Sequence, residues 1–249
     1  MAELPYEQRS QWLASVAAKL RHGGPRPDPI VVQELREVAR GCRLRLVESV
    51  EQELGPFDPR HLDALLEVPR ERFVRFDDLE RSADDVPLPM DANGLASISA
   101  PHAYLLSYRL LGLEPGDALV ELGAGSGYGA ALAAFVVGGD GRVVTFEIDP
   151  ELAARAIGRL SDQANVRVIE RDAMVSAPQW DGAKKVSVTF AVASLPGVWL
   201  DAIPEGGKLV APVGPQGADQ RLILVTKSAG ATFQADHGAV RYVSNRSVL

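Results

Sequence analysis

The chain has 249 residues, of which 46% are hydrophobic and 24% are charged, and its formal net charge is −7. These proportions are ordinary for a globular protein and argue against global disorder. The acidic balance argues against non-specific binding to nucleic acid or to an anionic membrane, because both depend on basic surface.

The sequence also bears on the cellular compartment. It contains a single cysteine, Cys42, so no intramolecular disulfide can form, whereas secreted proteins of this size often carry several cysteines. The first residues lack the basic start and the apolar run of a signal peptide. No apolar stretch approaches the ~20 residues that span a bilayer. We therefore expect a soluble cytoplasmic protein.

The N-terminal part of the chain is predicted to be helical. Apolar residues at spacings of one, three and four between residues 7 and 21 indicate one helical face. Glycines and prolines over residues 22–29 then mark a linker. A second helix is predicted from about Ile30 to Leu54. A third begins after Asp58, which is a suitable N-cap and is followed by Pro59.

From about residue 117 onward, strands and helices alternate. The expected strands cover residues 118–122, 142–147, 166–170, 186–190, 208–213, 221–226 and 239–243, and the helices 130–137 and 150–160. This alternation predicts a Rossmann-like α/β fold, with a mostly parallel sheet and two late antiparallel strands. We expect a helical extension at 1–57 and a main domain at 58–249, made of entry helices (58–100) and the sheet (101–249).

A glycine-rich loop follows the first of these strands and precedes a helix. Its sequence is Glu121-Leu-Gly-Ala-Gly-Ser-Gly-Tyr-Gly129, and glycines at such a turn let the backbone approach a ligand closely. A phosphate-binding loop would need Gly-Lys-Ser/Thr, which does not occur here. A dinucleotide site would have glycines spaced Gly-x-Gly-x-x-Gly, but Tyr128 stands where the third would fall.

Acidic residues at three strand ends favour a different ligand, S-adenosylmethionine. Glu121 ends the strand before the loop, where its charge would repel a pyrophosphate but suits the cationic methionine end of this cofactor, directly or through water. Glu147 ends the next strand and can accept hydrogen bonds from both ribose hydroxyls. Asp172 follows the third strand and can receive the adenine amino group. We expect the cofactor to contact Glu121, Gly123, Ala124, Gly125, Ser126, Gly127, Tyr128, Glu147, Ile148, Asp172 and Ala173.

Further stretches of the sequence stand out as motifs. They are Leu66-Glu-Val-Pro-Arg-Glu-Arg-Phe-Val, Asp85-Val-Pro-Leu-Pro, Ser97-Ile-Ser-Ala-Pro-His, Pro204-Glu-Gly-Gly-Lys-Leu-Val-Ala-Pro-Val-Gly and Val240-Arg-Tyr-Val. On these motifs the chain resembles the protein-L-isoaspartate O-methyltransferases, from near Asp58 onward and over about three-quarters of its length. The Ser-Ile-Ser-Ala-Pro-His motif is the most distinctive, because the glycine loop alone fits many unrelated methyltransferases.

The resemblance implies a carboxyl O-methyltransferase that acts on isoaspartyl residues of damaged proteins or peptides. It implies that Ser99 is the active-site hydroxyl that meets the acceptor carboxylate, and that Asp85 shapes the entrance to the pocket. Ser99 is also a candidate N-cap for the helix that starts near Pro101, and a helix N-terminus itself binds anions. An acceptor carboxylate is already ionised at pH 7, so the reaction needs no general base. We expect no metal site.

The substrate side of the chain departs from the family pattern. The loop from Pro89 to Ser97 is longer and lacks the family's glutamine. Phe190-Ala-Val-Ala-Ser replaces a segment of small residues, and Tyr242-Val-Ser-Asn replaces Phe-Val-Pro-Leu. Methyl transfer to a specialised peptide or to a small-molecule carboxylate therefore stays open. A non-catalytic module that binds the cofactor or a partner is a third alternative, which the intact Ser99 and Glu147 disfavour.

Overall fold

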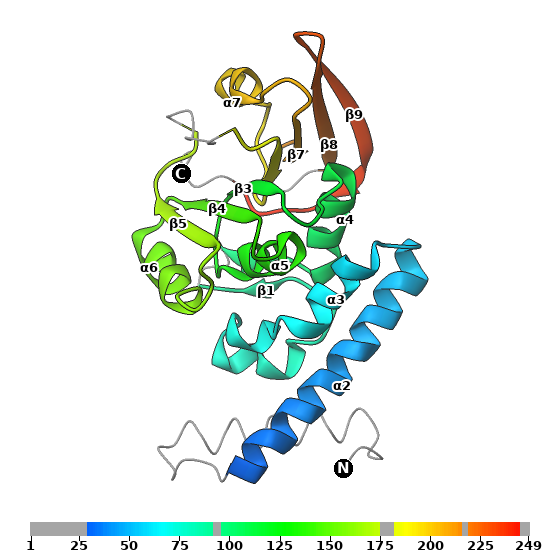
Figure 1. The fold of residues 1–249 in the computed structure, drawn as a ribbon, viewed down its shortest axis with the longest axis vertical. Helices are drawn as coiled ribbons and strands as arrows, with labels where there is room; N and C mark the ends of the chain where they lie inside the picture. The colour runs from blue at the N-terminus through cyan, green and yellow to red at the C-terminus, as the bar shows by residue number, and fades with distance from the viewer. Residues whose placement is uncertain (1–28, 92–95, 175–181, 216–218, 245–249) are drawn as a thin grey trace.

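The computed structural model describes residues 29–91, 96–174, 182–215 and 219–244. The helix predicted over residues 7–21 lies outside these residues, as does most of the linker after it. Figure 1 shows a main body from which a long helix, α2 (Pro29–Leu54), extends. Among the described helices, none is both long and apolar enough to cross a bilayer.

The two described helices of the N-terminal part confirm the sequence prediction. α2 ends at Leu54, and α3 (Pro59–Glu67) begins directly after Asp58. The carboxylate of Asp58 accepts a hydrogen bond from the amide of Arg60 at 2.8 Å, which is the expected N-cap contact. Proline at the first helical position adds to the cap, because its backbone already has helical φ.

The second half of α2 belongs to the core of the main body, because Leu46 and Val50 are buried there together with Leu65 of α3. The boundary after residue 57 between an extension and the main domain stays a prediction. Two 3₁₀ turns, Arg70–Arg72 and Phe76–Arg81, and a pair of short antiparallel strands, β1 (Leu88–Pro89) and β2 (Ser97–Ile98), lead from α3 to α4 (Pro101–Leu111).

A seven-stranded sheet forms the centre of the main body, with its strands in the order β5-β4-β3-β6-β7-β8-β9. The strands are β3 (Ala118–Leu122), β4 (Arg142–Glu147), β5 (Val166–Glu170), β6 (Lys185–Val188), β7 (Lys208–Val213), β8 (Gln220–Ser228) and β9 (Ala231–Val240). The first five pair in parallel, and β8 and β9 are antiparallel. The predicted mostly parallel sheet with late antiparallel strands is confirmed.

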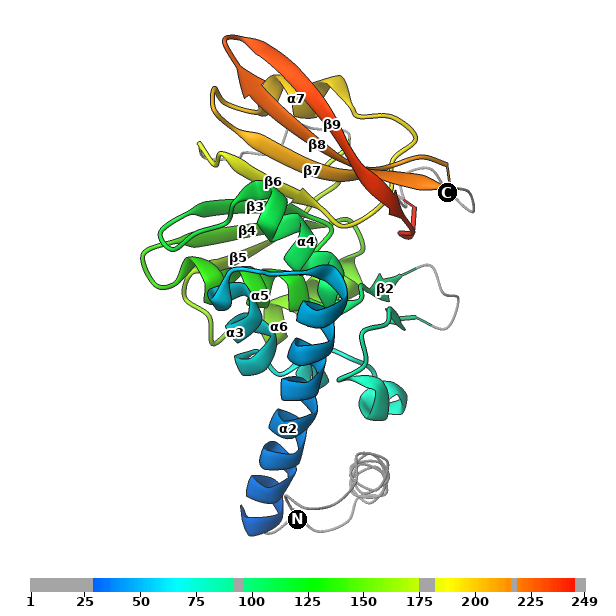
Figure 2. The ribbon, with the colours of Figure 1, turned by 90° about the vertical axis from the view of Figure 1, so that its right-hand side faces the viewer.

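Helices cover both faces of this sheet (Figure 2). α4 and α5 (Tyr128–Val137) pack on one face, α7 (Gly197–Ala202) packs on the other, and α6 (Pro150–Arg159) lies beside β4 and β5. Successive side chains of a strand point to opposite faces. In β3, Leu119 therefore enters the core under α4 and α5, whereas Val120 and Leu122 enter the core under α7.

The last strand differs from the prediction. We expect it at residues 239–243, but β9 covers Ala231–Val240 and follows β8 through a turn at Ala229 and Gly230, both with positive φ. The side chains of Ala231–His237 are all exposed, and Phe233 is exposed to 61%. A strand without a buried face carries no alternation of apolar and polar residues, so the sequence pattern could not locate it.

Candidate functional site

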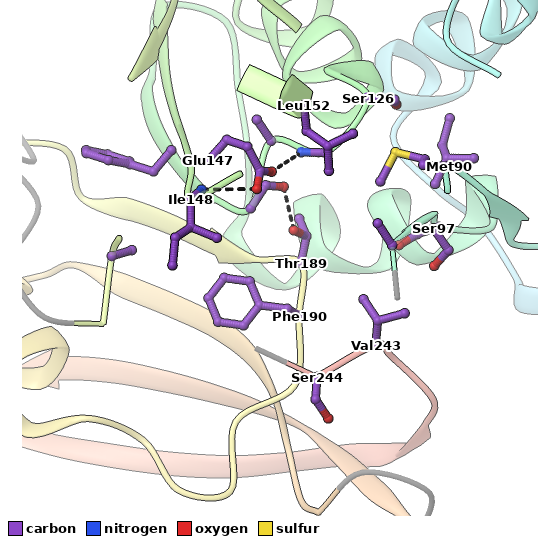
Figure 3. A pocket seen from close by; sticks show the side chains of 18 of the residues that line it. Met90, Ser97, Ser126, Glu147, Ile148, Leu152, Thr189, Phe190, Val243 and Ser244 are labelled. Carbon is purple, nitrogen blue, oxygen red and sulfur yellow. Dashed lines mark hydrogen bonds between the residues drawn. The ribbon is translucent and has the colours of Figure 1, made fainter. Parts of the chain in front are cut away.

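A pocket lies where β3, β4, β5 and β6 end at the carboxyl edge of the sheet (Figure 3). Its walls come from the glycine loop, the end of β4, the segments after β5 and β6, strand β2 and residues 243–244. Of the residues predicted from the sequence, the lining includes Ser99, Gly123, Ala124, Gly125, Ser126, Glu147, Ile148, Asp172 and Ala173. This edge of an open α/β sheet is where ligands bind.

The glycine loop has a backbone that only glycine adopts easily. Gly123, Gly125 and Gly127 all have positive φ, at 102°, 53° and 88°. A Cβ at Gly123 would overlap the hydroxyl of Thr189 and lie 2.9 Å from the ring of Phe190. The loop therefore passes close beneath the segment after β6, and its backbone is accessible from the pocket.

Glu147 links the end of β4 to the glycine loop. Its side chain is buried, and one carboxylate oxygen accepts a hydrogen bond from the amide of Gly125 at 2.7 Å. The other oxygen accepts from the amides of Ile148 at 3.0 Å and Asp149 at 3.1 Å. Figure 3 shows this carboxylate between the loop and Ile148. Each oxygen of a carboxylate has two lone pairs, so Glu147 keeps acceptor capacity for a ligand hydroxyl.

The segment after β5 is held by contacts on both sides. Asp172 accepts a hydrogen bond from the amide of Met174 at 2.8 Å. The carbonyl of Ala173 accepts a hydrogen bond from Nε1 of Trp199 at 2.9 Å, and this indole in α7 is fully buried. These contacts fix the backbone that carries Asp172 at the same sheet edge as Glu147.

Glu121 lies beneath the glycine loop and does not belong to the described lining of the pocket. It shares the face of Leu119, and its carboxyl group accepts a hydrogen bond from Thr145, its neighbour on β4, at 2.6 Å. The pKa of Glu121 is raised to about 8, because burial raises it more than the hydrogen bond from Thr145 lowers it, and the nearby charge of Glu147 also raises it. The carboxyl group is therefore mostly neutral at pH 7 and supplies little negative charge to a cationic ligand.

Gly127 and Tyr128 begin α5 and are also absent from the described lining. Gly127 is the N-cap of the helix, in the left-handed conformation. The ring of Tyr128 is buried in the core, 5.5 Å from the ring of Phe73 and 5.6 Å from that of Tyr104. Direct contact of these two residues with a cofactor stays a prediction.

Asp85 caps α4 from a distant part of the chain. Its carboxylate accepts a hydrogen bond from the backbone amide of His102 at 3.0 Å and lies 2.7 Å from Nδ1 of the same histidine. Burial alone would raise the pKa of Asp85, but the hydrogen bonds and the charge of His102, together with the charge of Arg70, hold it below its usual range. Asp85 is not part of the described lining, so its role at the pocket entrance stays a prediction.

Ser99 lines the pocket just before α4, and it is not the cap of that helix. The N-cap position is Ala100, which makes no side-chain capping hydrogen bond. The interpretation of Ser99 as an N-cap is therefore wrong, because Asp85 provides the capping carboxylate instead. Ser99 is half-buried, and its backbone amide donates a hydrogen bond to the phenolic oxygen of Tyr104 in α4.

Several lining residues were not predicted as site residues. Met90, Thr189, Phe190, Val243 and Ser244 all border the pocket. The ring of Phe190 also packs edge-on against Trp199, with the ring centres 6.1 Å apart. The position of Phe190 directly after a parallel strand was the available signal, because all such positions meet at one sheet edge. Residues 243–244 are held at this edge by a hydrogen bond from the amide of Ala191 to the carbonyl of Val243 at 2.8 Å.

The described residues hold no group of three or more histidine, cysteine, aspartate or glutamate side chains that could bind a metal ion. The pocket instead combines the accessible backbone of the glycine loop with carboxylates at strand ends and with hydroxyl groups. Such a set suits a ligand with sugar hydroxyls and a polar base, together with a second molecule held by hydrogen bonds.

Comparisons with known proteins agree on one family. The sequence matches the family model of protein-L-isoaspartate(D-aspartate) O-methyltransferase (PCMT) over residues 44–248. A protein-L-isoaspartate O-methyltransferase of Methanopyrus kandleri is 35% identical, with 83% of this chain and 92% of that protein covered. Protein-L-isoaspartate O-methyltransferase 2 of Archaeoglobus fulgidus is 36% identical, with 82% and 92% covered.

Solved structures share the fold. One named protein-L-isoaspartate O-methyltransferase superposes with a TM-score of 0.74 at 24% identity, over 82% of this chain and 65% of that one. Another, from Plasmodium falciparum and assigned to the same activity, is in complex with S-adenosyl-L-homocysteine. It superposes with a TM-score of 0.68 at 22% identity, over 80% and 96% of the two chains. With a family model that covers most of its length and relatives above 30% identity, the chain belongs to the protein-L-isoaspartate(D-aspartate) O-methyltransferase family.

Proposed function

We propose that this protein transfers a methyl group from S-adenosylmethionine to the side-chain carboxylate of isoaspartyl residues in proteins or peptides. The observation that carries the proposal is the convergence of the glycine loop, Glu147, Asp172 and Ser99 on one pocket in a chain of this family. These elements come from four separate parts of the sequence, so their meeting at one sheet edge is not a local accident of composition.

The residues present fit the cofactor. The carboxylate of Glu147 would accept hydrogen bonds from the ribose hydroxyls, and Asp172 with the backbone at Ala173 would receive the adenine. The backbone of the glycine loop lines the pocket from Gly123 to Ser126 and would receive the methionine part. Bound S-adenosylmethionine supplies an electrophilic methyl group on a sulfonium.

The chain's own contribution to the reaction is positioning. The acceptor carboxylate is ionised at neutral pH, so the protein has no proton to remove before the oxygen attacks. The hydroxyl of Ser99 would donate a hydrogen bond to this carboxylate and aim one oxygen at the methyl carbon. Holding two reactants in line supplies ~7–11 kcal/mol of the barrier reduction in well-oriented reactions. A single hydroxyl and a rigid pocket are therefore sufficient apparatus.

The proposal includes the nature of the acceptor and the location of the enzyme. The acceptor would be a protein or peptide. The pocket lining includes the apolar side chains of Met90, Phe190 and Val243, which suit a peptide segment better than a highly polar metabolite. A cytoplasmic location fits the single cysteine, since thiols stay reduced there.

The test incubates the purified protein with methyl-labelled S-adenosylmethionine and a peptide that carries one L-isoaspartyl residue. The matched control is the same peptide with a normal L-aspartyl residue. We expect base-labile methyl esters on the first peptide only. Cofactor binding in a calorimetric titration without transfer to either peptide would exclude the isoaspartyl acceptor. Absence of both binding and transfer would leave a non-catalytic module.

A further inference from the structure

The guanidinium of Arg70 connects two segments that meet beside the pocket. Arg70 is 1% exposed and donates from Nη1 to the carbonyls of Ser82 at 3.3 Å and Asp84 at 2.9 Å. From Nη2 it donates to the carbonyls of Val86 at 2.7 Å and Ser99 at 3.1 Å. One side chain thus holds both the turn that carries Asp85 and the residue proposed to meet the methyl acceptor.

The other side of Ser99 is held by Tyr104. The backbone amide of Ser99 donates to the phenolic oxygen of Tyr104 at 3.2 Å. The phenol is itself buried and lines the pocket. Burial, followed by the charge of Glu121, raises the pKa of Tyr104 to about 12, although Arg70 and the hydrogen bonds with Ser99 lower it. The group is neutral at physiological pH and keeps its hydroxyl proton.

We propose that Arg70 and Tyr104 are positioning residues for methyl transfer, which together clamp the backbone of Ser99 and so set the location of its hydroxyl. The carbonyl of Ser99 is bound by Arg70 and its amide by Tyr104, so both backbone polar groups of this residue are held in place. This inference rests on the proposed function. It goes beyond that function in naming two residues that would act through the backbone of Ser99.

The clamp matters because the reaction depends on geometry. In-line transfer requires the reacting atoms at ~3–3.5 Å, and a displacement of ~1 Å can cost ~10²-fold in rate. Burying a guanidinium is also unfavourable unless it is well paired, and here its partners are four carbonyl oxygens rather than a carboxylate. A side chain that served only to fill the core would need no such set of acceptors.

The central experiment compares Arg70→Lys with Arg60→Lys. A lysine ammonium is a compact donor and cannot reach the carbonyls of two segments at once, as the planar guanidinium of arginine does. Arg60 is a matched control, because its guanidinium also binds two backbone carbonyls, of Val136 at 2.6 Å and Phe135 at 3.0 Å, at the end of α5 and away from the pocket. Both variants lose a guanidinium group, so any difference in kcat between them reflects where the arginine lies in the structure.

We measure kcat and KM on the isoaspartyl peptide, cofactor affinity by calorimetry and melting temperature. Arg70→Lys should lower kcat by tenfold or more while cofactor affinity changes less than threefold. Arg60→Lys should lower the melting temperature and leave kcat unchanged. An unchanged kcat in folded Arg70→Lys would overturn the proposal. So would a parallel loss of kcat and cofactor affinity, since that indicates general loosening of the pocket.

A second variant, Tyr104→Phe, keeps the ring in the core and removes only the hydroxyl that accepts from Ser99. It should lower kcat by at least threefold without loss of cofactor affinity. If Arg70→Lys does not fold, the kcat of Tyr104→Phe alone tests the proposed positioning role.

Hydrogen exchange of the Ser99 amide is a readout independent of activity. It should accelerate in Tyr104→Phe and not in Arg60→Lys. Wild-type protein that leaves the isoaspartyl peptide unmethylated would contradict the proposed function, and unchanged exchange of the Ser99 amide in Tyr104→Phe would contradict the clamp.

Discussion

The carboxylate of Glu147 is bound to the amide of Gly125 at 2.7 Å, so the end of β4 and the glycine loop form one unit. Glu147 therefore does two things at once. It fixes the conformation of the loop, and it keeps one lone pair for a ligand. A cofactor that binds Glu147 meets a carboxylate whose orientation is already set by three backbone amides.

Replacing Glu147 should weaken the binding of S-adenosylmethionine. Hydrogen bonds to a charged group contribute roughly 1.5–3 kcal/mol, so Glu147→Ala should raise the dissociation constant roughly 10- to 150-fold in a calorimetric titration. Glu170→Ala is the control, because Glu170 ends the neighbouring strand in register with Glu147, is exposed and is not in the described lining. Equal affinities in the two variants would remove Glu147 from the site.

Removing the hydroxyl of Ser99 should affect turnover rather than stability. Because Ala100 occupies the N-cap position and Asp85 caps the helix, Ser99→Ala should change the free energy of unfolding by less than about 0.5 kcal/mol. The value of kcat/KM should fall tenfold or more, which corresponds to about 1.4 kcal/mol of lost transition-state stabilisation. Kinetics and denaturant unfolding on the same preparation check both. Full activity with reduced stability would contradict the proposed role.

Asp85 should matter for stability in a pH-dependent way. Asp85→Ala removes the cap of α4 and the contact with His102, at a cost of roughly 0.5–2 kcal/mol in the free energy of unfolding. Since the pKa of Asp85 lies below its ordinary value of 3.8 in the folded protein, this stabilisation is present above 3.8 and is lost as the pH falls through the folded value. Denaturant unfolding at pH 7 and near pH 3 checks the prediction, and an equal loss at both would contradict it.

Glu121 should give stability the opposite pH dependence. Its pKa is raised from 4.5 to about 8 in the folded protein, so it stabilises fully below 4.5 and loses this contribution as the pH rises to about 8. Between these values the unfolding free energy of the wild type should fall by up to about 1.4 kcal/mol per pH unit relative to Glu121→Gln, which cannot ionise. Unfolding curves that remain parallel for the two proteins would show that the carboxyl group is already ionised when folded.

Much of the sheet followed from the sequence because its strands are short runs rich in β-branched and apolar residues that alternate with helices. The bounds of β3, β4, β5 and β7 agree with the prediction, and the glycine loop falls where a strand meets a helix. The positions of Glu147 and Asp172 at one edge followed from the topology, since parallel strands end on the same side. The strand bounds and the position of the glycine loop depend on residues that are close together in the sequence, so the local pattern predicts them.

The parts that were missed depend on distant partners. Asp85 caps a helix 17 residues further along, and Arg70 reaches Ser99 across 29 residues, which local periodicity does not encode. The orientation of Glu121 was within reach, because strand alternation places it with Leu119 and away from Leu122. Contact of Glu121 with a cofactor, directly or through water, stays a prediction.

The indole of Trp199 offers an optical signal from the pocket. It is buried, donates to the carbonyl of Ala173 and packs against the ring of Phe190, and both of these partners line the pocket. Indole emission responds to the polarity and packing around the ring. A protein in which Trp12 and Trp180 are replaced by phenylalanine would retain Trp199 as its one tryptophan. Ligand entry at the edge of the sheet could then be followed in real time, without a label and without turnover.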